Sequence, residues 1–327
     1  MHQRKIGSLS VSALGLGCMN MSFGYGEADD EVSTRLLNQA IDTGYSFFDT
    51  AQVYGSGHNE SLIGNAISNR RDEYVLATKC GLSREHGING RPDLIMESCD
   101  ASLQRLQTDH IDLYYLHRVD PDIPIEESVG ALARLVEQGK VREIGLSEVC
   151  SENLKRAHHE FPIAALQSEY SLWSRTPERG IIETCSELDV TLVPFSPLGR
   201  AFLTGKAKDV SHLPDDDLRC NIARPRFEPE AFAENVKLLE PFGAIAKANE
   251  CSMAQLALAW LLARQERTMV PIPGTKHIEF MEENAGASEI VLDQSTVDEL
   301  DELINESTIT GARYSDARMA DTDAERD

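Results

Sequence analysis

The feature that most constrains the fold is an alternation of strand-like segments with amphipathic helical patterns along the whole chain. Apolar residues recur at three- and four-residue spacing in residues 31–44, 92–108, 124–140 and 252–265. The strand-like segments occupy residues 13–19, 45–51, 74–80, 111–117, 141–147, 164–170, 191–197 and 268–274. Eight strand–helix units in 327 residues predict an α/β protein with a single (β/α)8 TIM barrel.

Three further features refine this prediction. Gly7-Ser8 lies between two short β-prone segments, which predicts an N-terminal β-hairpin. The connection after the seventh strand, roughly residues 198–251, is the longest, and we expect a long functional loop there. The barrel is expected to form one domain over residues 1–327, whose end, about 308–327, is polar, acidic and partly mobile.

The composition narrows the function. The formal net charge of −23 disfavours nucleic acid or an anionic membrane surface as a partner. No apolar run approaches the roughly 20 residues that span a bilayer, and the first residues do not resemble a signal peptide, so we expect a cytoplasmic protein. The seven scattered cysteines predict reduced thiols and no metal site. The acidic, lysine-poor surface fits salt adaptation and ordinary solubility equally well.

Four titratable side chains follow three consecutive predicted strands. Asp49 ends the second strand with Tyr54 shortly after it, Lys79 ends the third, and His117 ends the fourth. Each residue alone has a structural explanation, such as a turn cap or a satisfied core histidine. In a barrel, however, the carboxyl ends of the strands form one rim, where catalytic groups gather. The sequence therefore predicts that these four side chains meet.

This set of side chains suits proton donation to a carbonyl oxygen. A free tyrosine titrates near pH ~10, and we expect a cation at Lys79 to lower the pKa of Tyr54. A decrease of roughly 2–3 units requires about 3–4 kcal/mol of differential stabilisation. Asp49 would keep Lys79 charged, and His117 would orient the substrate oxygen. The set provides no source of reducing equivalents, so another group must deliver them.

The chain resembles the aldo-keto reductase family over nearly its full length. The motifs that carry the resemblance include "ALGLGCM", "FFDTAQVYG", "LATKCG", "DLYYLHR", "IGLSE", "QSEYSL", "PFSPLGR" and "IPGTK". The resemblance implies a barrel whose bottom is closed by a hairpin, and NADPH-dependent reduction of small aldehydes or ketones. It also implies that Asp49, Tyr54, Lys79 and His117 form the catalytic tetrad, with Tyr54 as the general acid.

The resemblance also implies a set of cofactor-binding residues. Glu148 stands where the family usually has Asn, and a carboxylate can accept a hydrogen bond from the nicotinamide carboxamide but cannot donate one. Phe195 is expected to stack on the nicotinamide, and Lys276 to hold the 2′-phosphate near a helix N-terminus. The full set is Ser147, Glu148, Gln167, Phe195, Ser196, Leu198, Gly199, Arg200, Gly274, Thr275, Lys276, Glu283 and Asn284.

The substrate and the biological role are less constrained by the sequence. Arg224 and Arg226 in the long connection are expected to approach the cofactor phosphates or an acidic substrate. A regulatory subunit that binds NADPH with little turnover is an alternative to the reductase, and a cofactor-free barrel isomerase is a third possibility. The substrate, the direction of the reaction and the oligomeric state stay open. Residues expected to wall the substrate pocket are Met19, Tyr25, His86, Trp173 and Phe227.

Overall fold

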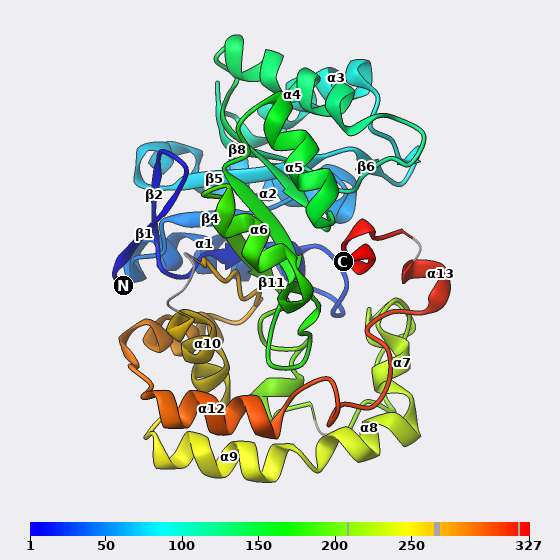
Figure 1. Ribbon diagram of the computed structural model, residues 1–327. Helices are drawn as coiled ribbons and strands as arrows, with labels where there is room; N and C mark the ends of the chain where they lie inside the picture. Colours follow the sequence, from blue (N-terminus) through cyan, green and yellow to red (C-terminus); the bar gives the residue numbers. More distant parts are fainter. Residues whose placement is uncertain (208, 265–268, 320) are drawn as a thin grey trace.

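The computed structural model describes residues 1–207, 209–264, 269–319 and 321–327, and its centre is a parallel β-sheet (Figure 1). Neighbouring strands follow the order β3-β4-β5-β8-β9-β10-β11, and every pair is parallel. This order is the order along the chain, as a barrel of β/α units requires. The strands are β3 (Leu16–Gly17), β4 (Phe47–Asp49), β5 (Val75–Cys80), β8 (Ile111–Leu116), β9 (Val141–Ser147), β10 (Ala165–Glu169) and β11 (Thr191–Phe195).

Residues 269–274 take the place of the eighth strand and close the barrel. The amides of Val270 and Ile272 donate to β11, and the carbonyls of Pro271 and Pro273 accept from residues 15 and 17, just before and in β3. Proline has no amide hydrogen, so only alternate residues of this segment donate, and it stays an irregular extended segment. Thr268, the first residue of the predicted strand, lies outside the described residues. The predicted (β/α)8 barrel is confirmed.

The N-terminal hairpin closes the end of the barrel at which the strands begin, as predicted. Strands β1 (Gln3–Ile6) and β2 (Leu9–Ser12) pair in antiparallel register through Gly7, whose φ is 53°. Ile6 and Val11 pack into the apolar interior of the barrel. Burying this interior removes apolar side chains from water, which is the main stabilising contribution in such a core.

Helices surround the barrel (Figure 1). Helix α1 shows how the sequence fixes their ends: the Asp29 side chain accepts from two first-turn amides, and Gly44 adopts the left-handed conformation after the last turn. The long helices follow the strand–helix alternation. They are α1 (Asp30–Thr43), α2 (His58–Ile67), α3 (Pro92–Leu106), α4 (Ile125–Glu137), α5 (Ser151–Glu160), α6 (Ile181–Glu187), α10 (Met253–Ala263), α11 (Ile278–Ala285) and α12 (Gln294–Leu303).

The connection after β11 differs from the predicted long loop. Its second half forms three helices, α7 (Arg224–Phe227), α8 (Pro229–Val236) and α9 (Leu239–Ala248). Pro225 and Pro229 lie in the first turns of α7 and α8, where a missing amide hydrogen costs nothing. The connection is long, as predicted, but the expectation of a loop was wrong for this half, which is helical.

Two smaller features complete the fold. Strands β6 (Leu82–Ser83) and β7 (Gly87–Ile88) form a short hairpin after β5 that the sequence analysis did not predict. The C-terminal segment contains α13 (Asp316–Met319) and folds back toward the middle of the molecule (Figure 1). In the part of the chain that the structure describes, no helix has the length and apolar character needed to cross a membrane.

Candidate active site

The four predicted catalytic residues lie together at the carboxyl ends of β4, β5 and β8. Asp49 is the last residue of β4, Lys79 is in β5, and His117 directly follows β8. Tyr54 lies in the turn between β4 and α2. The Tyr54 and His117 rings meet edge to face with their centroids 6.0 Å apart. The structure therefore brings the predicted set to one place on the barrel rim.

Lys79 is the centre of this group. Its ammonium donates to Asp49 Oδ1 at 2.5 Å, to the Thr50 carbonyl at 2.8 Å and to the Tyr54 hydroxyl at 3.3 Å. An ammonium has three hydrogens, so these contacts use all its donors. The Lys79 side chain is completely buried, and the Asp49 carboxylate compensates its charge.

The pKa of Tyr54 differs from the expectation. Burial raises the pKa of the Tyr54 hydroxyl, and the nearby Lys79 ammonium lowers it by less, so the pKa lies above its ordinary value. The expected decrease in the pKa included the effect of the Lys79 charge but omitted the cost of removing a phenolate from water. Tyr54 is consequently protonated at neutral pH, and its proton is available for transfer.

His117 is neutral at physiological pH. Burial lowers the pKa of its imidazole well below 6.5, and the Arg118 and Lys79 cations lower it further. A neutral imidazole carries one N–H and can donate one hydrogen bond. His117 Nδ1 is buried, and it has no hydrogen-bond partner among the described residues. This ring therefore suits a hydrogen-bonding role better than that of a cation.

Gln167, expected to contact the cofactor, also contacts the catalytic group. Its amide nitrogen donates to Asp49 Oδ2 at 2.7 Å, whereas Lys79 occupies Oδ1. Burial raises the pKa of Asp49 above its ordinary value, and Lys79 and Gln167 oppose this rise. Gln167 thereby helps to keep Asp49 oriented.

The other residues expected at the nicotinamide follow β9 and β11. Ser147 ends β9, and the Arg118 guanidinium donates to its hydroxyl at 3.2 Å. Phe195 ends β11 with its ring partly exposed. Ser196, Leu198, Gly199 and Arg200 form a tight turn after it, closed by a hydrogen bond from the Gly199 amide to the Ser196 carbonyl.

Glu148 makes contacts that the sequence analysis did not anticipate. Its side chain is buried, Oε2 accepts from Arg313 at 2.5 Å, and Oε1 accepts from the Glu169 amide at 2.8 Å. Arg313 comes from the C-terminal segment, which the sequence analysis treated as a partly mobile tail. No local sequence signal links residues so far apart.

The residues expected at the adenosine phosphate surround the start of α11. Thr275 accepts from the His277 amide at 3.0 Å, and Gly274 forms a bridge with Gly17 of β3. The Lys276 ammonium donates to the carbonyls of Tyr25, at 2.9 Å, and Glu27. No carboxylate forms an ion pair with Lys276 within the described ranges, so the charge of this lysine is not neutralised there.

Two further residues of this region lie in α11. Glu283 pairs with Lys206 from the connection after β11 at 3.1 Å, and Asn284 is buried. The connection thus reaches the segment where the adenosine is expected.

The five expected substrate-wall residues have different environments. Trp173 and Phe227 are buried in an aromatic cluster, where Trp173 stacks on Phe202 at 4.1 Å between ring centroids. Both rings pack against other aromatic rings in stacked and edge-to-face arrangements. Met19 and Tyr25 are partly buried, and His86 is exposed in the β6–β7 hairpin. 

Both arginines of α7 contact other groups of the protein. Arg224 pairs with Glu228 on the same stretch of chain at 2.6 Å. Arg226 donates to the Trp173 carbonyl and to the Ser174 hydroxyl. These contacts attach α7 to the loop after β10.

Sequence reasoning missed the buried network below Tyr54. Asn59 accepts from the Thr50 hydroxyl at 2.6 Å and donates to the Cys18 carbonyl at 2.9 Å. Glu60 accepts from the Thr78 hydroxyl and pairs with Arg105. Both residues open α2, directly after the Tyr54 turn, so this network fixes the turn relative to β5. A short polar pair at a helix start gives no sequence signal for such a role.

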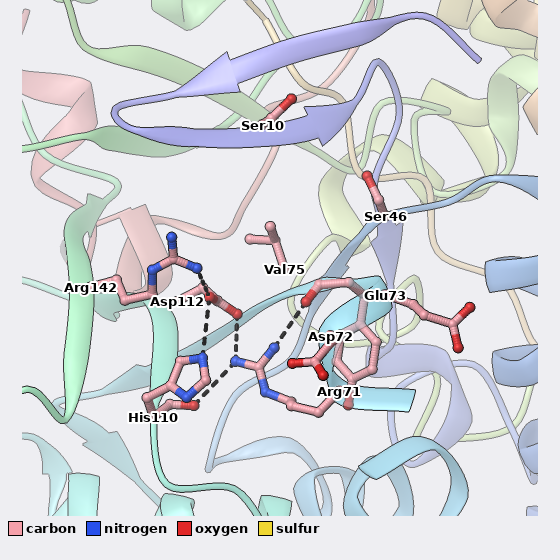
Figure 2. A pocket seen from close by; sticks show the side chains of 10 residues that line it. Ser10, Ser46, Arg71, Asp72, Glu73, Val75, His110, Asp112 and Arg142 are labelled. Atoms are coloured by element: carbon pink, nitrogen blue, oxygen red, sulfur yellow. Dashed lines mark hydrogen bonds and ion pairs between the residues drawn. The ribbon is translucent and has the colours of Figure 1, made fainter. Parts of the chain in front are cut away.

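A hollow of about 230 Å³ lies where β5, β8 and β9 begin, at the other end of these strands from the catalytic residues. Figure 2 shows the side chains that line it. Asp112, buried at its centre, accepts from Arg71 at 2.5 Å, from Arg142 at 2.8 Å and from the Leu76 amide at 2.8 Å. Figure 2 shows the Arg71 and Arg142 side chains converging on this carboxylate. The Asp112 carboxylate is thus satisfied by the protein itself, and the cluster joins β5, β8 and β9.

Comparisons with known proteins agree with this geometry. The aldo-keto reductase yakc of Schizosaccharomyces pombe, whose name specifies NADP(+), is 42% identical over 95% of this chain and 94% of its own length. Glycerol dehydrogenase from Gluconobacter oxydans superposes with a TM-score of 0.84 at 27% identity, covering 92% of this chain and 94% of that one.

A second solved structure and a family model extend the comparison. The aldo/keto reductase from Klebsiella pneumoniae, solved with NADP and acetate, superposes with a TM-score of 0.74 at 29% identity over 94% of this chain and 95% of that one. The model of the aldo/keto reductase family matches residues 13–305. That match spans the barrel and all four residues of the predicted tetrad, and the chain belongs to the aldo/keto reductase family.

Proposed function

We propose that this protein is an NADPH-dependent reductase of small aldehydes or ketones, with Tyr54 as the general acid. The observation that carries the proposal is the Asp49–Lys79–Tyr54 chain of contacts at the barrel rim, with His117 beside it. Such a set holds a protonated phenol where a carbonyl oxygen can approach. The family supports the reaction class, and the relatives named for or solved with NADP support the cofactor.

The residues on the rim fit a dinucleotide cofactor. Phe195 presents a partly exposed ring for stacking, and the Ser147 and Gln167 side chains lie at the adjacent strand ends. Lys276 carries a positive charge near the start of α11. A 2′-phosphate there would interact favourably with this charge and with the helix N-terminus. When bound, NADPH supplies the hydride that reduces the carbonyl carbon.

The chain's own residues supply the proton and the electrostatics. The Tyr54 hydroxyl donates its proton to the carbonyl oxygen as that oxygen gains negative charge. The Lys79 ammonium stabilises the negative charge that Tyr54 then acquires, and Asp49 keeps Lys79 charged. A neutral His117 donates a hydrogen bond that positions the substrate oxygen. This assignment supports catalysis by transition-state stabilisation rather than by a nucleophile.

The test is a titration of the wild-type protein with NADPH and with NADH, followed by turnover of an aldehyde and ketone panel. We expect tighter binding of NADPH, because only NADPH carries the 2′-phosphate for Lys276. Turnover is followed by the loss of reduced-nicotinamide absorbance. Tight binding without turnover of any panel member would favour the regulatory-subunit alternative, and absence of binding would contradict the proposal.

A further inference from the structure

The C-terminal segment is bound to the loop that follows β9. The Ala324 amide donates to the Glu148 carbonyl at 3.1 Å. Asp323 accepts from the Cys150 amide at 2.9 Å and from the Asn153 side chain at 2.7 Å. Five polar groups of residues 148–153 thus have partners in the last residues of the chain, because the Ser151 amide and hydroxyl both donate to Asp327.

These contacts also cap helix α5. The side chain of the residue before its first turn, Cys150, makes no capping hydrogen bond. Asp323 and Asp327 accept the amide hydrogens of Cys150 and Ser151 instead. Carboxylates at a helix N-terminus satisfy free amides and interact favourably with the helix dipole. The N-terminal cap of α5 thus comes from residues that are far away in the chain.

A buried chain of charges joins the same segment to three strand ends. Arg313 pairs with Glu148 after β9 and lies 3.4 Å from Glu169 of β10. Arg200, after β11, pairs with Glu169 at 2.8 Å and donates to the Tyr314 hydroxyl at 3.1 Å. All four charged side chains are at least nine-tenths buried. Charges buried in this way require their partners, since an unpaired buried charge is strongly destabilising.

Glu148 is fully engaged by this arrangement. Both carboxylate oxygens, its amide and its carbonyl have protein partners. Burial raises the pKa of Glu148, but Arg313 and Arg118 lower it by more, so the carboxylate is ionised. Its backbone adopts a left-handed φ of 55°, which side-chain-bearing residues hold only when the surroundings fix it.

We propose that Arg313 is a positioning residue of the cofactor site, and that Glu148 anchors the C-terminal segment rather than binding the nicotinamide carboxamide. The Arg313–Glu148 pair holds the backbone next to Ser147. Arg313 and Arg200 also share Glu169 as a partner. Docking of the C-terminal segment therefore fixes both loops that flank the nicotinamide. This inference rests on the proposed function. It follows that cofactor binding and docking of the segment stabilise each other.

The first test compares NADPH affinity in single and double variants, measured by quenching of tryptophan fluorescence. Arg313→Gln should weaken NADPH binding about tenfold or more, within the usual range of about 5–150-fold for coupled sites. The double variant Glu148→Gln/Arg313→Gln should bind more tightly than Arg313→Gln, because it has no uncompensated carboxylate at 148. Arg326→Gln removes an exposed guanidinium from the same segment and leaves the bonds from Cys150 and Asn153 to Asp323 in place, so this variant should bind within about twofold of wild type.

The second test uses the full wild-type chain, so it does not depend on folding of a variant. Reciprocal coupling predicts that saturating NADPH slows the release of C-terminal residues by a carboxypeptidase. Equal release with and without NADPH, or an Arg313→Gln variant that melts lower yet binds NADPH as wild type does, would overturn the inference. Failure of the wild type to bind NADPH would instead overturn the proposed function.

Discussion

At the scale of single residues, Lys79 shows how the site depends on charge compensation. The Lys79–Asp49 pair is fully buried. Replacing Lys79 by Met leaves the Asp49 carboxylate unpaired, and we expect a loss of about 3–5 kcal/mol in the free energy of unfolding. Urea unfolding measures this loss.

A matched control separates this effect from the general loss of a lysine. Lys155 pairs with Glu187, and both side chains are about half exposed. Lys155→Met should cost less than about 1 kcal/mol, since exposed pairs contribute little. Similar losses for the two variants would contradict the account of the buried pair.

The pKa values of Tyr54 and His117 predict the pH dependence of carbonyl reduction. Tyr54 acts in its protonated form, and its pKa lies above the ordinary value of ~10. His117 acts in its neutral form, and its pKa lies well below 6.5. We therefore expect kcat/KM for the carbonyl to be level from about pH 7 to about pH 9, in the range between these two pKa values.

The same pH profile of kcat/KM can also contradict this expectation. A fall in kcat/KM centred between about pH 7 and 9 would mean that the acid has a lowered pKa, as the sequence alone suggested. Measurement at saturating NADPH, with cofactor binding checked at each pH, excludes an effect on the cofactor.

The roles of residues were predictable where titratable side chains occur at a defined place in the fold. Asp49, Tyr54, Lys79 and His117 follow strands, and the barrel geometry brings strand ends together. The partner of Glu148 was not predictable, because Arg313 is far away in the chain and lies in a polar tail. The burial of individual side chains was not predictable either. The residue type of Trp173 gave no sign that it stacks on Phe202.

At the scale of elements, helices α2 and α3 pack closely at Gly64. A Cβ atom at Gly64 would lie 2.4 Å from the Arg105 carbonyl oxygen, so alanine forces the helices apart. We expect Gly64→Ala to destabilise the protein by about 1–3 kcal/mol. Because α2 begins just after the Tyr54 turn, turnover should decrease as well.

Gly130 in α4 provides the control for this substitution. A Cβ atom there meets only Glu160 Oε1, at 3.7 Å, within the described structure. Alanine is the better helix former, so Gly130→Ala should leave stability unchanged or raise it by about 0.5–1 kcal/mol. Thermal unfolding of both variants compares the two, and an equal decrease would show that helix spacing at Gly64 is not the cause.

Helices and strands with regular apolar patterns in the sequence were the most predictable elements. Strand β9 has the predicted bounds, and β5 and β8 differ by one residue, because long apolar runs mark strands buried on both faces. The segment 269–274 is irregular because of its prolines, although its place in the barrel was predicted. Helices α8 and α9 were not predicted, because the connection after the seventh strand was assigned as a loop from its length alone.

At the scale of the whole molecule, the net charge of −23 destabilises the folded protein by an amount that depends on the salt concentration. Like charges on one surface repel, and monovalent salt screens them over about 10 Å at 0.1 M. We expect the melting temperature to rise as KCl increases from about 0.05 to about 0.5 M. A melting temperature that falls or does not change would mean that favourable ion pairs outweigh the repulsion.

The central claim is that Tyr54 is the proton donor of an NADPH-dependent reductase, and Tyr54→Phe tests it most directly. Phenylalanine keeps the ring that packs beside His117 and removes only the hydroxyl. Turnover of the best carbonyl substrate should fall by about 10²–10⁴-fold, the usual contribution of a general acid. NADPH affinity, measured in the same preparation, should stay at the wild-type value. Turnover within a few-fold of wild type would contradict the account.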